Sequence, residues 1–330
     1  MESKKMHAIV ATGYGAPEVL KYKEVDIPMP GEHEILIKVM VSSVTRADTM
    51  MRTGKPYFGR FFTGLTKPKH PIPGTGFSGE VVGTGDKVSH FEMGDRVFGE
   101  TTLGFSTNAE YVVVPENGVV LHKPENLRHE EAATYCDGPL TSYYFLKELA
   151  KVKPGQKVLV NGAAGSLGTA AVQLAKKMGA EVTGVCSARN TGLVKSLGAD
   201  HLLDYNEQDF TRSGKKYDIV YDTVGKSSFR QSRRVLSTDG IYLSPVLSFG
   251  LLLRMMLTSG TGRKKAVFAA SGMKKDAELQ SLLSELVGVH QESGFQIVID
   301  RQFPLEKVSQ AHTYVDKGHK KGNVIIIVQS

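Results

Sequence analysis

The chain has 330 residues, a length typical of two domains, and its 41% of hydrophobic residues suffices for a sizeable core. Its net charge of +7 is modest, and its short basic clusters do not alternate with aromatic residues, so a nucleic-acid surface is not indicated. Two cysteines, Cys136 and Cys186, exclude a disulfide framework and favour a reducing compartment.

Neither the first residues nor the apolar stretches indicate secretion or a membrane span. Residues 1–7 lack the apolar core of a signal peptide. The most apolar stretch, residues 241–257, is too short to cross a bilayer and contains Arg254. We therefore expect a cytoplasmic protein.

The first third of the chain favours short strands separated by glycine turns. In residues 34–41 the apolar side chains alternate, which places Ile35, Ile37, Val39 and Val41 on one face. Further strands are expected at residues 79–88, 94–98, 111–114 and 120–123. This part of the chain should form a β-rich domain.

After Pro124 the pattern changes to alternating helices and strands. A helical segment is expected at residues 128–150, and short apolar runs then predict strands at 157–160, 182–185, 201–203, 219–221, 241–243 and 267–270. Helix-like segments lie between most of these runs, which indicates a parallel sheet covered on both faces. The tail from residue 296 onward predicts a strand, a helix and a last strand.

A glycine-rich turn follows the first of these strands and opens a helix with apolar positions at helical spacing. Gly165 would let the backbone approach a pyrophosphate, and Gly168 would let the helix pack closely on its strand. Ala163 stands where the usual pattern has its first glycine, with Gly162 beside it. Backbone N–H groups at the helix start favour an anion. The predicted dinucleotide contacts are Gly162, Ala163, Ala164, Gly165, Ser166, Leu167 and Gly168.

Five short motifs, in order, resemble the zinc-independent medium-chain dehydrogenases/reductases of the quinone oxidoreductase, or zeta-crystallin-like, type. They are residues 15–20, 94–98, 140–144, 162–168 and 221–225. The resemblance implies an α/β fold: a GroES-like β-rich catalytic domain at 1–125, a Rossmann NADP-binding domain with a doubly wound parallel sheet at 126–293, and a return segment at 294–330 that completes the catalytic domain. It also implies an active site between the domains and a homodimer.

The residues at the zinc positions of related dehydrogenases do not make a metal site. The first catalytic cysteine position corresponds to Thr45, and the histidine position to Thr75, with Gly76 beside it. The third ligand corresponds to Asp137 or, one residue earlier, to Cys136. Zinc sites need three or four such ligands, so we expect no metal.

The resemblance also indicates which nicotinamide cofactor is bound. A carboxylate after the second strand selects NAD, and residues 185–190 contain none. Ser187 offers a hydroxyl, Arg189 a guanidinium suited to phosphate, and Tyr205 matches a tyrosine that lines this pocket in the family. We therefore expect NADPH, although Arg189 in a purely solvated position is the alternative.

Three further cofactor contacts follow from the family pattern alone. Thr141 matches a threonine near the nicotinamide ring, and Ser244 ends the strand that runs beside it. Asn323 stands where the family often has a lysine that reaches the cofactor.

Without a metal, hydride transfer needs an acceptor that is already electrophilic, such as a quinone or an α,β-unsaturated carbonyl. Thr45 replaces the asparagine, and Met50 the tyrosine, that quinone reductases commonly have. The candidate catalytic residues are therefore Thr45, which can donate one hydrogen bond, and Tyr57, a candidate proton donor to which solvent or a ribose hydroxyl is the alternative. Residues 54–68 contain four aromatic residues and form either a lid over an apolar acceptor or a loop packed on the domain. Residues 251–257 form a core helix, a dimer surface or a wall of the substrate site.

The sequence thus predicts an NADPH-dependent reductase of a small apolar quinone or carbonyl substrate, with nucleic acid an unlikely partner. The alternative from another class is a non-catalytic NADPH-binding or redox-sensing protein, RNA binding included, because Thr45 and Met50 depart from the family pattern. A zinc-type alcohol dehydrogenase is the third hypothesis.

Overall fold

The computed structural model describes residues 4–55, 57, 60–258 and 263–329. The chain forms two compact units. The first, the β-rich unit, comprises Met1–Asp137, Lys275–Glu285 and Ile299–Ser330, and the second, the α/β unit, comprises Gly138–Lys274 and Leu286–Val298. The domain boundaries expected from the sequence, at residues 125 and 293, stay a prediction.

The β-rich unit contains a hairpin and a seven-stranded sheet. The hairpin pairs β1 (Lys5–Ala11) with β2 (Leu20–Asp26). The sheet has the order β14-β15-β3-β4-β5-β7, with β6 on β3. Its strands are β3 (Glu34–Val44), β4 (Gly76–Thr84), β5 (Arg96–Glu100), β6 (Tyr111–Pro115), β7 (Val119–His122), β14 (Ile299–Pro304) and β15 (Asn323–Ile327). The predicted alternation is confirmed for Ile35, Ile37 and Val39, which are fully buried in one cluster, whereas Val41 is buried in another cluster, beyond an irregularity in the pairing of β3 with β4.

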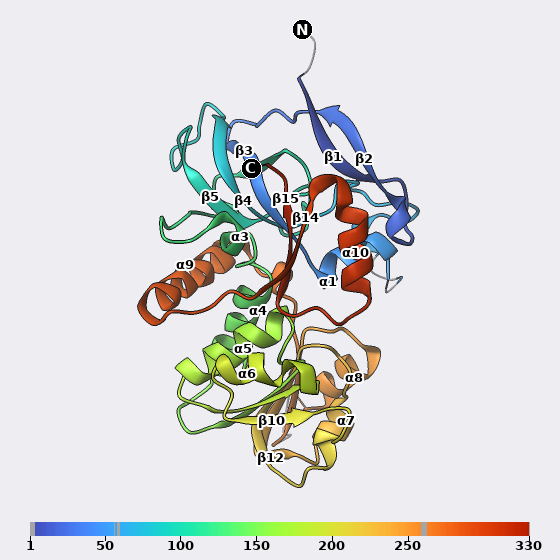
Figure 1. Ribbon diagram of the computed structural model, residues 1–330, viewed down its shortest axis with the longest axis vertical. Coiled ribbons are helices and arrows are strands. Elements are labelled where there is room, and N and C mark those ends of the chain that lie inside the picture. The colour runs from blue at the N-terminus through green and yellow to red at the C-terminus, as the bar shows by residue number, and fades with distance from the viewer. Residues whose placement is uncertain (1–3, 56, 58–59, 259–262, 330) are drawn as a thin grey trace. The chain divides into compact units, whose positions relative to one another are not determined.

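The C-terminal tail forms the predicted strand, helix and strand. β14 and β15 are parallel, joined through α10 (Val308–Asp316), and β15 pairs antiparallel with β3. Figure 1 shows these two dark red strands beside the blue β3. The hydrophobic side chains of the tail, among them Val308, Val324 and Ile326, share a core cluster with Ile9 and Val44. The last residues therefore complete the core that the first residues begin.

A helix that the sequence analysis did not predict, α1 (Arg46–Thr53), follows β3. Thr45 caps it: its hydroxyl accepts from the Asp48 N–H, while the Asp48 carboxylate accepts from the Thr45 N–H. This is a reciprocal capping box, for which threonine followed three residues later by an acid is the signal. Gly54, with φ +60°, ends the helix in the left-handed conformation that glycine adopts most easily.

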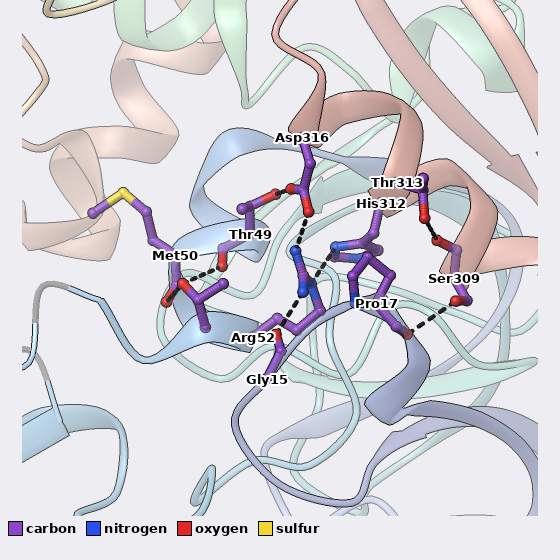
Figure 2. Close-up of polar contacts among 10 residues, drawn as sticks. Gly15, Pro17, Thr49, Met50, Arg52, Ser309, His312, Thr313 and Asp316 are labelled. Carbon is purple, nitrogen blue, oxygen red and sulfur yellow. Dashed lines mark hydrogen bonds and ion pairs between the residues drawn. The ribbon is translucent and has the colours of Figure 1, made fainter.

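A buried cation joins α1 to α10 (Figure 2). The Arg52 side chain is 1% exposed, and its guanidinium donates to Asp316 Oδ2 at 2.6 Å and to the Gly15 carbonyl at 2.6 Å. Its Nε donates to His312 Nδ1 at 3.3 Å. Because that nitrogen accepts, His312 is neutral, and burial, then the Arg52 charge, lower its pKa to about 3. Two segments far apart in the chain are thereby held together.

The α/β unit is built on six parallel strands in the order β10-β9-β8-β11-β12-β13. They are β8 (Lys157–Asn161), β9 (Glu181–Cys186), β10 (His201–Asp204), β11 (Tyr217–Asp222), β12 (Leu236–Ser244) and β13 (Lys265–Phe268). Helices α5 (Ser166–Lys177), α6 (Thr191–Ser196), α7 (Phe229–Ser232) and α8 (Phe249–Thr258) connect them. The predicted parallel sheet is confirmed, and strand order reverses at β8, where such folds bind ligands.

The helical segment expected at residues 128–150 is interrupted. It consists of α3 (His129–Ala132), α4 (Gly138–Tyr144) and a π-helical segment, Phe145–Leu149. Pro139 explains why a new helix, α4, begins at Gly138, because proline is tolerated in the first turn of a helix but not in its interior. The remaining long helix is α9 (Asp276–Ser293). Of the helices that the structure describes, none has the length and apolar character required to cross a membrane.

The neutral, buried His312 predicts a pH-dependent stability. Its folded pKa of about 3 lies below the ordinary 6.5, so the unfolded state binds the proton first and stability falls as pH drops from 6.5 toward 3. Between pH 7.5 and 5.5, we expect wild type to lose about 1.4 kcal/mol more than His312→Gln in urea unfolding. The raised pKa of Asp48 increases stability as pH falls, but it does so equally in wild type and in His312→Gln and therefore cancels in the comparison. Equal losses would contradict the prediction.

Candidate cofactor and active site

The turn after β8 is shaped by two glycines. Gly162 has φ +81°, a conformation that side-chain-bearing residues rarely adopt, so it is the turn glycine that the sequence pattern left undecided. A Cβ on Gly168 would lie well inside contact distance of the Gly162 carbonyl and the Ala163 backbone. The close approach expected of Gly168 is therefore present, between helix α5 and the turn itself.

Helix α5 begins without a side-chain cap. Gly165 is its N-cap residue and has no oxygen to offer, whereas Ser, Thr, Asp or Asn usually accepts from the first turn. The N-terminus carries the positive end of the helix dipole. A helix start with these properties, directly after a parallel strand, suits a pyrophosphate.

Thr141 lies on a helix packed against this turn. The Ser142 hydroxyl of α4 donates to the Leu167 carbonyl at 2.8 Å, and a Cβ on Gly138 would collide with Ser166. Thr141 itself is 9% exposed, and its hydroxyl lies 3.0 Å from the Ser271 hydroxyl. Helix α4, which carries Thr141, thus packs against the start of α5, and the cofactor contact of Thr141 stays a prediction.

The residues predicted to read the 2′ position also lie together. The Asp204 carboxylate, at the end of β10, accepts from the Ala188 N–H at 2.9 Å and so ties this strand to the turn after β9. Ser187 is buried, and its hydroxyl has no hydrogen-bond partner within the described chain. Arg189 is exposed, and Tyr205 is 51% exposed. A buried hydroxyl without a partner usually has an explanation, and a ligand is one.

A buried carboxylate that the sequence analysis did not single out organises the same edge of the sheet. Asp222 ends β11, and its oxygens accept from the Asn161 side chain at 2.9 Å, the Tyr242 hydroxyl at 2.9 Å and the N–H groups of Gly225 and Ser227. The Ser244 hydroxyl donates to the Asp222 carbonyl at 2.8 Å, so its hydrogen is used inside the protein. The signal was the motif at residues 221–225, whose aspartate the resemblance left without a role.

Three predicted site residues belong to the β-rich unit: Thr45, Asn323 and Tyr57. Thr45 is 3% exposed, and its hydroxyl donates to Asp48 Oδ2 at 2.8 Å, so its hydrogen is already engaged. Burial, and to a lesser extent Asp137, raises the pKa of Asp48 to about 6 although Thr45 and Gly74 donate to it. Asn323 begins β15 and is 3% exposed.

Tyr57 and the predicted lid lie beyond α1. Tyr57 is 65% exposed, and the Arg60 guanidinium lies 4.9 Å from the centre of its ring. Phe61 is 78% exposed. Pro56, Phe58 and Gly59 of the lid lie outside the described residues. The choice between a lid and a packed loop therefore stays open, although the rings of Tyr57 and Phe61 are exposed.

Comparison with known proteins decides the family. The alcohol dehydrogenase GroES-like domain model matches residues 31–125, and the zinc-binding dehydrogenase model matches residues 197–326. The chloroplastic quinone-oxidoreductase QR1 of Triphysaria versicolor is 32% identical over 339 residues, which cover 99% of each chain. The chain belongs to the quinone oxidoreductases, the zinc-independent branch of the medium-chain dehydrogenases/reductases. It is an oxidoreductase that binds a nicotinamide dinucleotide.

Solved structures, a quinone oxidoreductase among them, share the whole fold. The enzyme from Coxiella burnetii superposes with a TM-score of 0.88 at 29% identity, covering 99% of this chain and 100% of that chain. A mycobacterial protein solved with NADPH gives a TM-score of 0.81 at 26% identity, covering 98% of this chain and 100% of that one. Both the β-rich GroES-like unit and the parallel-sheet unit are therefore those of this family.

The residues at the zinc positions agree with this branch of the family. Thr45 is committed to its capping box, and a threonine also stands at the histidine position, Thr75. Within the part of the chain that the structure describes, no three His, Cys, Asp or Glu side chains are grouped as metal ligands. The described side chains around Thr45 therefore do not supply the three or four ligands that a zinc ion needs.

The close packing of Gly168 gives a test of the quinone oxidoreductase turn. We expect Gly168→Ala to cost about 1–3 kcal/mol of unfolding free energy, because backbone atoms must move to admit the methyl group, and to weaken dinucleotide binding. Gly192→Ala is the matched control: nothing lies near its added Cβ, so it should be neutral or stabilising by about 0.4–1 kcal/mol. Denaturant unfolding and fluorescence titration measure both; equal effects of the two would refute the packing role.

Proposed function

We propose that this protein is an NADPH-dependent reductase that transfers hydride to an activated acceptor, a quinone or an α,β-unsaturated carbonyl, without a metal. The observation that carries the cofactor choice is the turn after β9, with Ser187, Arg189 and Tyr205 and no acid between residues 185 and 190. Relatives named quinone oxidoreductase, and an enoyl reductase among the structures of the same fold, support the reaction class.

The turn after β9 fits a phosphate better than a pair of ribose hydroxyls. Arg189 is exposed and forms no ion pair with any residue that the structure describes, so its guanidinium is available. The Ser187 hydroxyl points to no acceptor of the protein within the described residues. The nearby acid, Asp204, is occupied: one oxygen accepts from Ala188, and the other accepts from the N–H and the side chain of Asn206.

The remaining groups have roles that follow from their positions. When bound, the nicotinamide supplies the hydride. We propose that the start of α5 holds the pyrophosphate and that Thr141 and the backbone at Ser244 position the ring. Thr45 and Tyr57 are the proposed donors to the oxyanion that forms on the acceptor. Because Thr45 donates to Asp48, protonation of Asp48 would weaken the hydrogen bond that engages the threonine hydrogen.

A comparison of NADPH with NADH tests the function and the cofactor choice together. Initial rates of oxidation with a set of quinones and enones should show turnover with NADPH and little with NADH. In Arg189→Ala, we expect the KM for NADPH to rise about ten- to hundredfold, the value of charged hydrogen bonds, with little change for NADH. Arg230→Ala, an exposed arginine on α7, should change neither.

Two outcomes of this assay count against the proposal. Equal losses for NADPH and NADH in Arg189→Ala would remove its phosphate role while leaving the reductase intact. Tight NADPH binding without turnover on any acceptor would instead favour the non-catalytic alternative.

We propose a homodimer formed along the edge of the parallel sheet. β13 is the last strand of that sheet, and the preceding helix α8 leaves Phe249 at 84%, Met256 at 73% and Leu257 at 64% exposure. Only Leu251 of its apolar residues is buried, so α8 is not a core helix. An exposed apolar face beside a strand edge is typical of an interface. The two free, buried cysteines support a cytoplasmic location.

Light scattering tests the dimer. Wild type should have about twice the mass of one chain, and Met256→Glu should be a monomer that keeps its melting temperature, because a charge cannot be buried unpaired in an interface. Met273→Glu, an equally exposed methionine outside α8, should remain dimeric. A wild-type monomer would refute the proposal.

A further inference from the structure

The β-rich unit contains a cavity of about 450 Å³ to which the proposed reaction assigns no residue. It lies between the hairpin β1–β2 and the strands β5, β6 and β7, and the first residue of α9 closes one side. This volume is within the range of about 300–1,000 Å³ typical of small-molecule sites. We call it the acidic pocket, because its charged lining residues are Asp26, Glu34, Glu100 and Asp276.

The charge of the acidic pocket is one-sided. Among the described residues that line it there is no lysine, arginine or histidine, although the chain as a whole carries a net charge of +7. Asp26 has an exposed partner outside the lining, Lys5, at 2.6 Å. Among the residues that the structure describes, the Glu34 side chain accepts from the Gly31 N–H alone, at 2.8 Å. No counter-ion in the lining balances Glu100 and Asp276.

Glu100 is the most unusual group of the pocket. It ends β5, and its Oε1 is buried with no hydrogen-bond partner in the described part of the chain. Burial, then the charges of Asp137 and Asp276, raises its pKa to about 8. The neighbouring Cys136 thiol is also buried, and its own pKa is raised, so it supplies no charge that would stabilise the carboxylate. Buried carboxyl groups are normally hydrogen-bonded or paired, because leaving them unpaired is costly. A bound cation would supply the missing partner.

The rest of the lining is apolar and aromatic, and one wall is strained. Phe105 and Tyr111 line the pocket with valines of β6. In the loop after β5, Thr102, Phe105 and Ser106 have φ of +46°, +54° and +81°. Such angles are unfavourable for residues other than glycine and tend to occur where a loop serves a ligand. Aromatic faces also attract organic cations.

We propose that the acidic pocket binds a small organic cation, an ammonium group carried on an apolar or aromatic body, with its charge at Glu100 and Asp276 and its body against Phe105 and Tyr111. The cofactor is not a candidate occupant, because its phosphates are anionic and the contacts proposed for its pyrophosphate and nicotinamide ring lie in the α/β unit.

Benzyltrimethylammonium is a suitable probe, since its charge does not change with pH, and benzyl alcohol is its neutral counterpart. In isothermal titration calorimetry at pH 8.5 the cation should bind wild type and the alcohol should not. At pH 6.5, where the Glu100 carboxyl is protonated, the affinity should be about tenfold lower. Glu100→Gln should bind about ten- to hundredfold more weakly at pH 8.5 and lose the pH dependence.

Glu306→Gln, an exposed acid of the same unit outside the pocket, should bind like wild type. If Glu100→Gln does not fold, as judged by circular dichroism, Asp276→Asn replaces it, since asparagine is tolerated at a helix start. Failure of the cation to bind wild type at millimolar concentration, equal binding of the neutral alcohol, or unchanged binding in the folded pocket variant would each overturn the proposal. The reductase assay is independent of all three.

Discussion

The hydrogen bonds of Asp222 are the interaction on which the cofactor edge of this protein depends. This fully buried carboxylate contacts Asn161 at the end of β8, Tyr242 of β12 and the turn that follows its own strand, through Gly225 and Ser227. Three neighbouring strands of the parallel sheet therefore end in a fixed arrangement. A buried charge is tolerated here because every side of the carboxylate meets a donor.

This fixed edge holds the glycine turn beside it. Thr223 donates to the Asn161 carbonyl at 2.7 Å, directly before Gly162, and a side chain on Gly162 would meet Thr223 and Val224. The turn is thus confined on one side by Thr223 and Val224, which follow Asp222, and on the other by Gly168 of α5. A backbone surface held in this way presents N–H groups to a pyrophosphate without reorganising, which is the physical basis of a preformed anion site.

The β-rich unit contains two ionisable groups that are buried in contrasting ways. Arg52 is paired with Asp316, His312 and the Gly15 carbonyl, and the result is a structural joint between α1 and α10. Glu100 is buried without such partners, and it lines a cavity. In a folded protein the partners of a buried charge offset its loss of hydration, whereas a buried polar group without a partner costs stability and so points to a ligand.

Much of the fold was predictable because its signals are local. Period-two alternation identified β3, and a glycine pattern between an apolar run and a helix identified β8, the turn and α5. The interruption at Pro139 and the capping box at Thr45 also have local sequence signals. The first was missed because the surrounding segment is long and apolar, and the second because Thr45 was expected to be catalytic.

The pairing partners, burial and geometry of the site depended on the tertiary structure. Arg52 and Asp316 are separated by 264 residues, and the tie between Asp204 and Ala188 joins the ends of two strands. The same holds for the burial of Ser187 and of the Glu100 Oε1 atom, since neither side chain is normally buried. Composition and spacing determine which local structures a segment prefers, whereas long-range chain packing decides which polar groups meet, and which remain without a partner.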